Sequence, residues 1–97
     1  MPYQVVFPGD LDEYDWAEIE AKGWLDGVRI VRNGDEFTLA IYDQVRLPQA
    51  ITVDVERLGY FAASRLLVVP RLSRDDIEIA IGRMVERGFL DLLHETH

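Results

Sequence analysis

The sequence predicts an α+β domain in which helices cover an open sheet. Two local patterns carry the prediction: a β-hairpin signal centred on Asn33-Gly34, and an apolar run at 65–70 followed by a helical pattern at 73–88. The chain has 97 residues, of which 48% are hydrophobic. A chain of this size buries only about 60 to 65% of its unfolded surface, so we expect one compact domain spanning residues 1–97.

The hairpin lies in the stretch "GVRIVRNGDEFTLAIY". Asn and Gly both tolerate the positive φ angles that a type I′ turn requires, and a two-residue turn determines the strand register. The predicted pairs are Arg32 with Asp35, Val31 with Glu36, Ile30 with Phe37, Arg29 with Thr38 and Val28 with Leu39. Apolar residues then meet across the strands, and Arg32 meets an opposite charge.

A first strand and an acidic helix are expected before the hairpin. "YQVVFP" at 3–8 is β-branched and aromatic and is followed by glycine, which is typical of a strand. In the stretch "GDLDEYDWAEIEAKGWLD", Asp12 suits an N-cap and Gly23 a helix end, which predicts a helix of about ten residues. Trp16 and Ile19 lie on one arc of this helix, and Tyr14, Ala17 and Ala21 lie on another.

The segment 45–61 has two competing interpretations. Ile51, Val53 and Val55 alternate like a strand, whereas Leu47, Ile51, Val55 and Leu58 form one helical stripe. We favour a helix over 48–58, because Pro48 suits a first helical turn and Gly59 a C′ position. If residues 50–56 were instead a strand, the sheet would be larger and mostly antiparallel.

A last strand and a last helix complete the pattern. "RLLVVP" at 65–70 is a continuous apolar run, which predicts a central strand buried on both faces. Ser73 then supplies an N-cap, Asp76 occupies the capping-box position, and Gly88 ends the helix. The apolar tail "FLDLL" at 89–93 is expected to lie against the sheet edge, and "HETH" is expected to fray.

In chain order these elements are strand, helix, strand, strand, helix, strand, helix. The order βαββαβ is that of a ferredoxin-like split β-α-β sandwich, here with an added C-terminal helix. The α+β class holds whether residues 48–58 form a helix or a strand.

The charge is negative and unevenly placed. The net charge is −8, and residues 1–28 hold seven acids against Lys22, while residues 29–97 hold eleven acids and nine arginines. A negative field repels phosphate backbones, so we expect no nucleic-acid partner, and a basic protein surface is the natural complement. The longest apolar runs fall far short of the roughly 18 residues that a membrane span needs. The absence of cysteine favours a cytoplasmic location.

We predict no catalytic residue, metal ligand or cofactor. Asp10, Asp12 and Asp15 do not begin an EF-hand, because Tyr14, Asp15 and Ala21 stand where a ligand, a glycine and a bidentate glutamate are needed. The only histidines, His94 and His97, end the chain. Without cysteine or an internal histidine, a nucleophilic triad lacks its base, and the glycines form no phosphate-binding loop.

Acids and amphipathic aromatics together predict a protein-binding surface. The residues expected to contact the partner are Asp12, Asp15, Trp16, Glu18 and Glu20. The predicted function is a non-catalytic acidic interaction domain, of the kind used by inhibitors, immunity-like proteins and regulators of basic partners. Trp24, at a strand entry, is expected to be buried.

An alternative comes from a different class of protein. A small-molecule-binding or carboxylate-based enzyme domain would form a pocket between the sheet and the helices, in a homo-oligomer joined along strand edges. A concave apolar pocket would favour this alternative, and a flat acidic patch with an exposed Trp16 would favour partner binding. A third interpretation gives the acidity no role beyond solubility.

Overall fold

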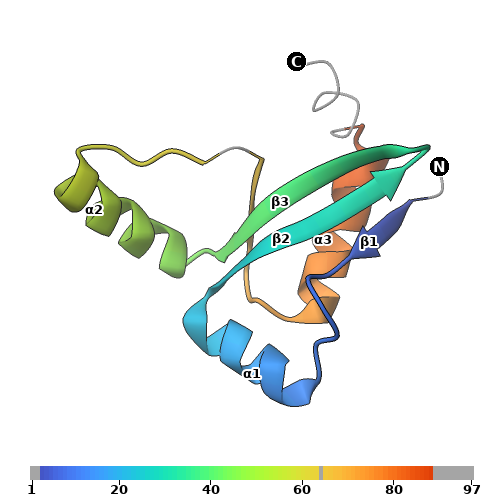
Figure 1. Cartoon of the computed structure of the whole chain (residues 1–97), viewed down its shortest axis with the longest axis horizontal. Helices are drawn as coiled ribbons and strands as arrows, with labels where there is room; N and C mark the ends of the chain where they lie inside the picture. The colour runs from blue at the N-terminus through green and yellow to red at the C-terminus, as the bar shows by residue number, and fades with distance from the viewer. Residues whose placement is uncertain (1–2, 64, 89–97) are drawn as a thin grey trace.

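The computed structural model describes residues 3–63 and 65–88, which form a four-stranded mixed sheet and three helices (Figure 1). In chain order the elements are β1 (Gln4–Val6), α1 (Glu13–Lys22), β2 (Trp24–Arg32), β3 (Asp35–Asp43), α2 (Arg46–Leu58), β4 (Leu66–Val69) and α3 (Arg74–Glu86). The predicted α+β class and the predicted order of elements along the chain are both confirmed.

The hairpin of β2 and β3 has the predicted register. All five predicted pairs are present, from Arg32 opposite Asp35 to Val28 opposite Leu39. Asn33 and Gly34 have φ angles of 53° and 82°, as a type I′ turn requires. The turn and the apolar alternation therefore specify the same pairing. The two strands of this hairpin form the centre of the sheet, with β1 and β4 at its edges.

Residues 48–58 are helical, as predicted, within α2. Gly59 ends the helix in the left-handed conformation, and its N–H donates to the Val55 carbonyl over 2.9 Å. At the other end, the Asp43 carboxylate accepts hydrogen bonds from the backbone N–H groups of Val45 and Arg46. The alternation of Ile51, Val53 and Val55 finds no strand partner, and the helical stripe determines the local structure.

The order of strands in the sheet differs from a ferredoxin-like arrangement. The strands lie in the order β1-β2-β3-β4, with β1 and β2 as antiparallel neighbours and β3 and β4 parallel. A split β-α-β unit would place another strand between the two strands that α1 connects. Figure 1 shows α1 beyond one end of the hairpin, so the chain reverses there and returns beside β1. The prediction was right for the chain order and wrong for the pairing of β1.

The predicted central strand is an edge strand. β4 pairs with β3 alone, and in the described part of the chain no strand lies beyond it. Val69 is buried in the core, but Leu66 and Val68 on the opposite face are 36% and 43% exposed. A continuous apolar run predicts burial on both faces, whereas the described residues cover only one face of β4.

The core lies between the sheet and α3, which packs behind the hairpin in Figure 1. Its buried residues are Ile19, Leu25, Val28, Ile30, Phe37, Leu39, Ile41, Val69, Leu72, Ile77 and Ile81. Most of the sheet residues in this set alternate along β2 and β3, and Ile77 and Ile81 lie one turn apart on α3. The predicted tail at 89–93, together with His94 and His97, lies outside the described residues.

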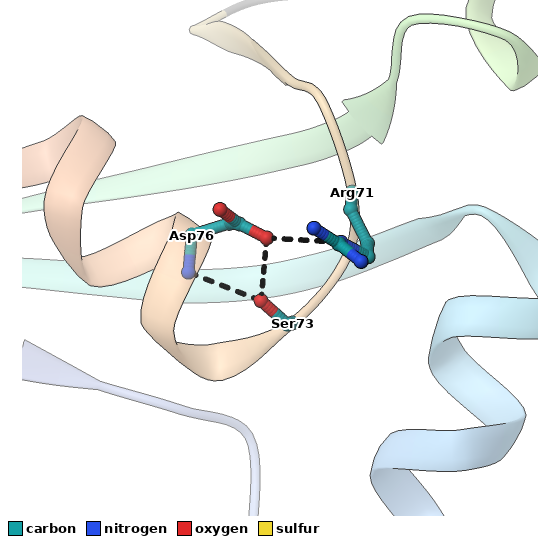
Figure 2. A network of polar contacts seen from close by, with 3 residues as sticks. All are labelled: Arg71, Ser73 and Asp76. Carbon is teal, nitrogen blue, oxygen red and sulfur yellow. Dashed lines mark hydrogen bonds and ion pairs between the residues drawn. The ribbon is translucent and has the colours of Figure 1, made fainter.

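The start of α3 is held by a small polar network (Figure 2). The Ser73 hydroxyl oxygen accepts from the Asp76 N–H over 3.1 Å and donates to the Asp76 carboxylate over 2.7 Å. Arg71 Nε donates to the same carboxylate oxygen over 3.3 Å. The predicted N-cap is therefore confirmed, and Asp76 supports it through the hydroxyl of Ser73 and through Arg71.

Candidate functional site: the acidic face of α1

The first turn of α1 contains a reciprocal capping box. Asp12 Oδ1 accepts from the Asp15 N–H over 2.9 Å, and Asp15 Oδ2 accepts from the Asp12 N–H over 3.2 Å. Each carboxylate thereby satisfies a backbone donor that the helix itself leaves free. Two of the five predicted partner-binding residues thus have a structural role, while their negative charge still contributes to the local field.

We expect Asp12→Ala to lower the free energy of unfolding by about 1 kcal/mol, because the substitution removes an N-cap acceptor. Glu18→Ala, in the exposed middle of the same helix, should change it by less than about 0.5 kcal/mol. Urea unfolding of both variants measures the difference. Equal effects of the two substitutions would contradict the capping role.

Trp16 packs α1 against the segment that follows β1. Its ring meets Phe7 edge to face, with 5.2 Å between the ring centroids and 83° between the planes, and it packs against the core. The Arg74 guanidinium lies 5.3 Å from the centroid of the same Phe7 ring. Trp16 is half-buried, so its main contacts are internal.

Trp24 is half-buried rather than fully enclosed. The Lys22 ammonium lies 4.0 Å from the centroid of its ring, a cation–π contact between the end of α1 and the start of β2. The only lysine of the chain is therefore directed to a neighbouring aromatic ring.

Tyr14 is the aromatic residue that stands exposed among the acids. It is 71% exposed, whereas Ile19 on the inner side of α1 is buried. Glu18 follows one turn after Tyr14, so the two side chains are neighbours on the outer surface of the helix. The sequence places Tyr14 and Trp16 on different arcs of the helix. Which of the two arcs faces the core depends on the contact of Trp16 with Phe7, which the helical pattern alone does not show.

Glu13, Glu18 and Glu20 are exposed, and within the described residues none of them has an ion-pair partner. Acids elsewhere do have such partners: Glu36 pairs with Arg29, Asp76 with Arg71 over 3.3 Å, and Glu78 with Arg74 over 3.7 Å. These three carboxylates of α1 are therefore unpaired, and the acids of the helix outnumber its single cation, Lys22, so a net negative field extends into solvent.

Two surface hollows flank Trp16 and Arg74. The first, of about 330 Å³, lies between α1 and the start of α3. It is lined by Glu13, Trp16, Ala17, Glu20, Leu72, Ser73, Arg74 and Asp75. The second, of about 320 Å³, lies between Trp16 and the segment 4–11. The exposed carboxylates at the first hollow can receive a cationic side chain, with Trp16 beneath its apolar stem.

Residues 3–63 and 65–88 contain no group of three or more acids or histidines placed to hold a metal ion. No helix among them is long and apolar enough to cross a membrane. Comparison of the chain with protein-family models, with curated proteins and with solved structures finds no significant match. The residues of the site are therefore the basis for a functional hypothesis.

Proposed function

We propose that the protein is a non-catalytic interaction domain that binds a basic protein through the acidic face of α1, defined as Glu13, Tyr14, Glu18 and Glu20. The observation that carries the proposal is the set of carboxylates, unpaired among the described residues, around a 71% exposed tyrosine. Long-range attraction would speed the encounter with a basic surface, and burial of Tyr14 would then slow dissociation.

The remaining predicted residues support this face. Asp12 and Asp15 add negative charge while they cap α1, and Trp16 holds the helix in place and forms part of the adjacent hollow. A lysine or arginine of the partner would enter that hollow between Glu13 and Glu20. Inhibitors, immunity-like proteins and regulators of basic proteins act by such a surface, and a chain without cysteine suits action in the cytoplasm.

The test compares two variants of equal charge. Glu18→Lys/Glu20→Lys changes the net charge of −8 by four, to −4, and so does the control Glu56→Lys/Glu86→Lys at exposed positions on α2 and α3. Each protein is immobilised on a resin and incubated with source-cell lysate at low and at raised salt. The captured proteins are then quantified by mass spectrometry. We expect a basic protein to be captured by wild type and control, to be lost with the α1 variant, and to be weakened by salt.

Tyr14→Ala separates anchoring from charge, because the net charge stays at −8. Removing a hot-spot aromatic typically costs at least about 2 kcal/mol of binding free energy, or roughly thirtyfold in affinity. Equal capture by wild type and by the α1 charge variant would overturn the proposal.

A further inference from the structure

α2 is an amphipathic helix whose apolar stripe is uncovered. Leu47, Ile51, Val55 and Leu58 share one side of the helix, yet none of its thirteen residues is buried. Leu58, at the far end of the stripe, is 55% exposed. Figure 1 shows α2 projecting away from the end of β3, with the chain returning to β4 by a separate path.

Among residues 3–63 and 65–88, the sheet has an uncovered apolar face as well. Opposite the α3 side, Leu66 and Val68 on β4 lie beside Ala40 and Tyr42 on β3, and Trp24 on β2 lies beside Tyr42. Leu66 and Val68 are exposed, and Ala40, Tyr42 and Trp24 are half-buried. We call this set the bare face.

Both surfaces are unusual for a parallel β-α-β unit. The helix that connects two parallel strands normally packs on their sheet, and parallel strands are normally covered on both faces. α2 connects the parallel neighbours β3 and β4, but it leaves their bare face open. The continuous apolar run of β4 nevertheless has the composition of a strand that is buried on both of its faces.

We infer that the protein forms a two-fold dimer in which α2 of each copy packs its apolar stripe on the bare face of the other copy's sheet. The exchange restores the expected covering of β3 and β4, and it uses the same two surfaces twice, which closes the assembly at two copies. Because α2 already projects from its own sheet, the arrangement needs no change of fold.

Charge favours a second copy over a basic partner at this surface. α2 carries Arg46 and Arg57 against Asp54 and Glu56, so its net charge is zero, unlike the acidic face of α1. Two copies can therefore meet at α2 without bringing their acidic segments into the interface. A basic protein would instead be attracted to the carboxylates of α1 that are unpaired among the described residues.

The exposed apolar side chains also favour a dimer. Six large apolar side chains at or next to these two surfaces are exposed, namely Ile51, Val55, Leu58, Tyr60, Leu66 and Val68. Contiguous exposed apolar patches beyond a few hundred Å² mark interaction sites. Each copy would contribute both a helix face and a sheet face, so the dimer would bury each of the two surfaces twice; a standard stable interface buries about 800 Å² per partner.

Light scattering coupled to gel filtration tests the dimer. We expect wild type to have twice the chain mass of 11.2 kDa and Val55→Lys/Leu58→Lys to have the mass of one chain. The control Thr52→Lys/Glu56→Gln adds the same charge on the polar side of α2 and should stay dimeric. A wild-type protein of one chain mass at every concentration, or a dimer unaffected by the first variant, would overturn the inference.

Cross-linking tests the packing, because the chain has no cysteine of its own. Val55→Cys and Val68→Cys proteins, mixed after separate purification and then oxidised, should form a disulfide between the two variants. If disulfides form mainly between two Val55→Cys chains rather than between Val55→Cys and Val68→Cys chains, α2 packs on α2 of the other copy. A monomeric disulfide in the doubly substituted chain would show that α2 folds onto its own sheet. Either result would overturn the arrangement.

Discussion

Ile77→Ala is expected to lower the free energy of unfolding by about 2 to 5 kcal/mol, the range for a large aliphatic side chain removed from a packed core. Ile77 is completely buried on the inner side of α3, in a cluster with Leu72, Ile81 and the sheet residues Ile30 and Ile41. The substitution removes apolar contacts and leaves a cavity that the surrounding sheet can fill only in part. Since small domains are stable by only about 5 to 15 kcal/mol, the loss is a large share of the total.

The same helix supplies the control. Ile79 is 53% exposed, so Ile79→Ala removes little buried area and replaces a β-branched residue with a better helix former. We expect its effect to stay within about 0.5 kcal/mol. Urea unfolding followed by circular dichroism measures both variants, and Ile77→Val, with an expected loss of about 0.5 to 1.5 kcal/mol, keeps the comparison measurable. Equal losses at positions 77 and 79 would show that α3 does not pack as described.

The hairpin and α3 were predictable from sequence because their signals are local and mutually consistent. Asn33-Gly34 determines a turn, the turn determines a register, and that register pairs Ile30 with Phe37, which is the pairing observed. For α3, Ser73 is the N-cap as predicted, the C-cap is Arg87, one residue before the predicted Gly88, and Ile77 and Ile81 mark the buried side. Agreement of turn chemistry, capping and periodicity leaves few alternatives open.

The sheet order was not predictable in the same way, because it depends on contacts between elements far apart in the chain. The residue pattern of α1 does not indicate whether the helix packs across a face of the sheet or lies beyond the ends of the strands. The apolar run of β4 predicts a central strand, but a run buried by a partner molecule has the same composition as one buried within the chain.

The candidate site was predictable in its charge but not in its anchor. Asp12 and Asp15 were expected at the start of α1, and their carboxylates lie there, engaged in capping. Trp16 is predicted to contact the partner, and the structure shows its ring half-buried against Phe7 from the segment after β1. Tyr14 is left on the outside because the helix turns its arc away from Ile19 and the core.

A second large effect is expected at Gly23, the residue that joins α1 to β2. Its φ of 83° lies in the left-handed region, its N–H donates to the Ile19 carbonyl over 2.9 Å, and its carbonyl accepts from the Asp43 N–H over 3.0 Å. A Cβ added here would lie 2.8 Å from Arg46 Cβ and 2.9 Å from Asp43 Oδ2. The contact at Arg46 involves the fixed base of a side chain, so the start of α2 would have to shift.

Gly23→Ala should therefore lower the free energy of unfolding by about 3 kcal/mol, from about 1 to 2 kcal/mol for the left-handed conformation and a comparable overpacking cost. Gly59→Ala is the matched control, because Gly59 ends α2 at a φ of 84° with no atom within 4 Å of the added Cβ. That variant should lose only the conformational part. Urea unfolding of the two proteins gives the difference, and equal losses would mean that α1, β3 and α2 do not meet at Gly23. A larger loss at Gly23 would show that α1, the end of β3 and the start of α2 pack closely around this glycine, where only a residue without a Cβ fits.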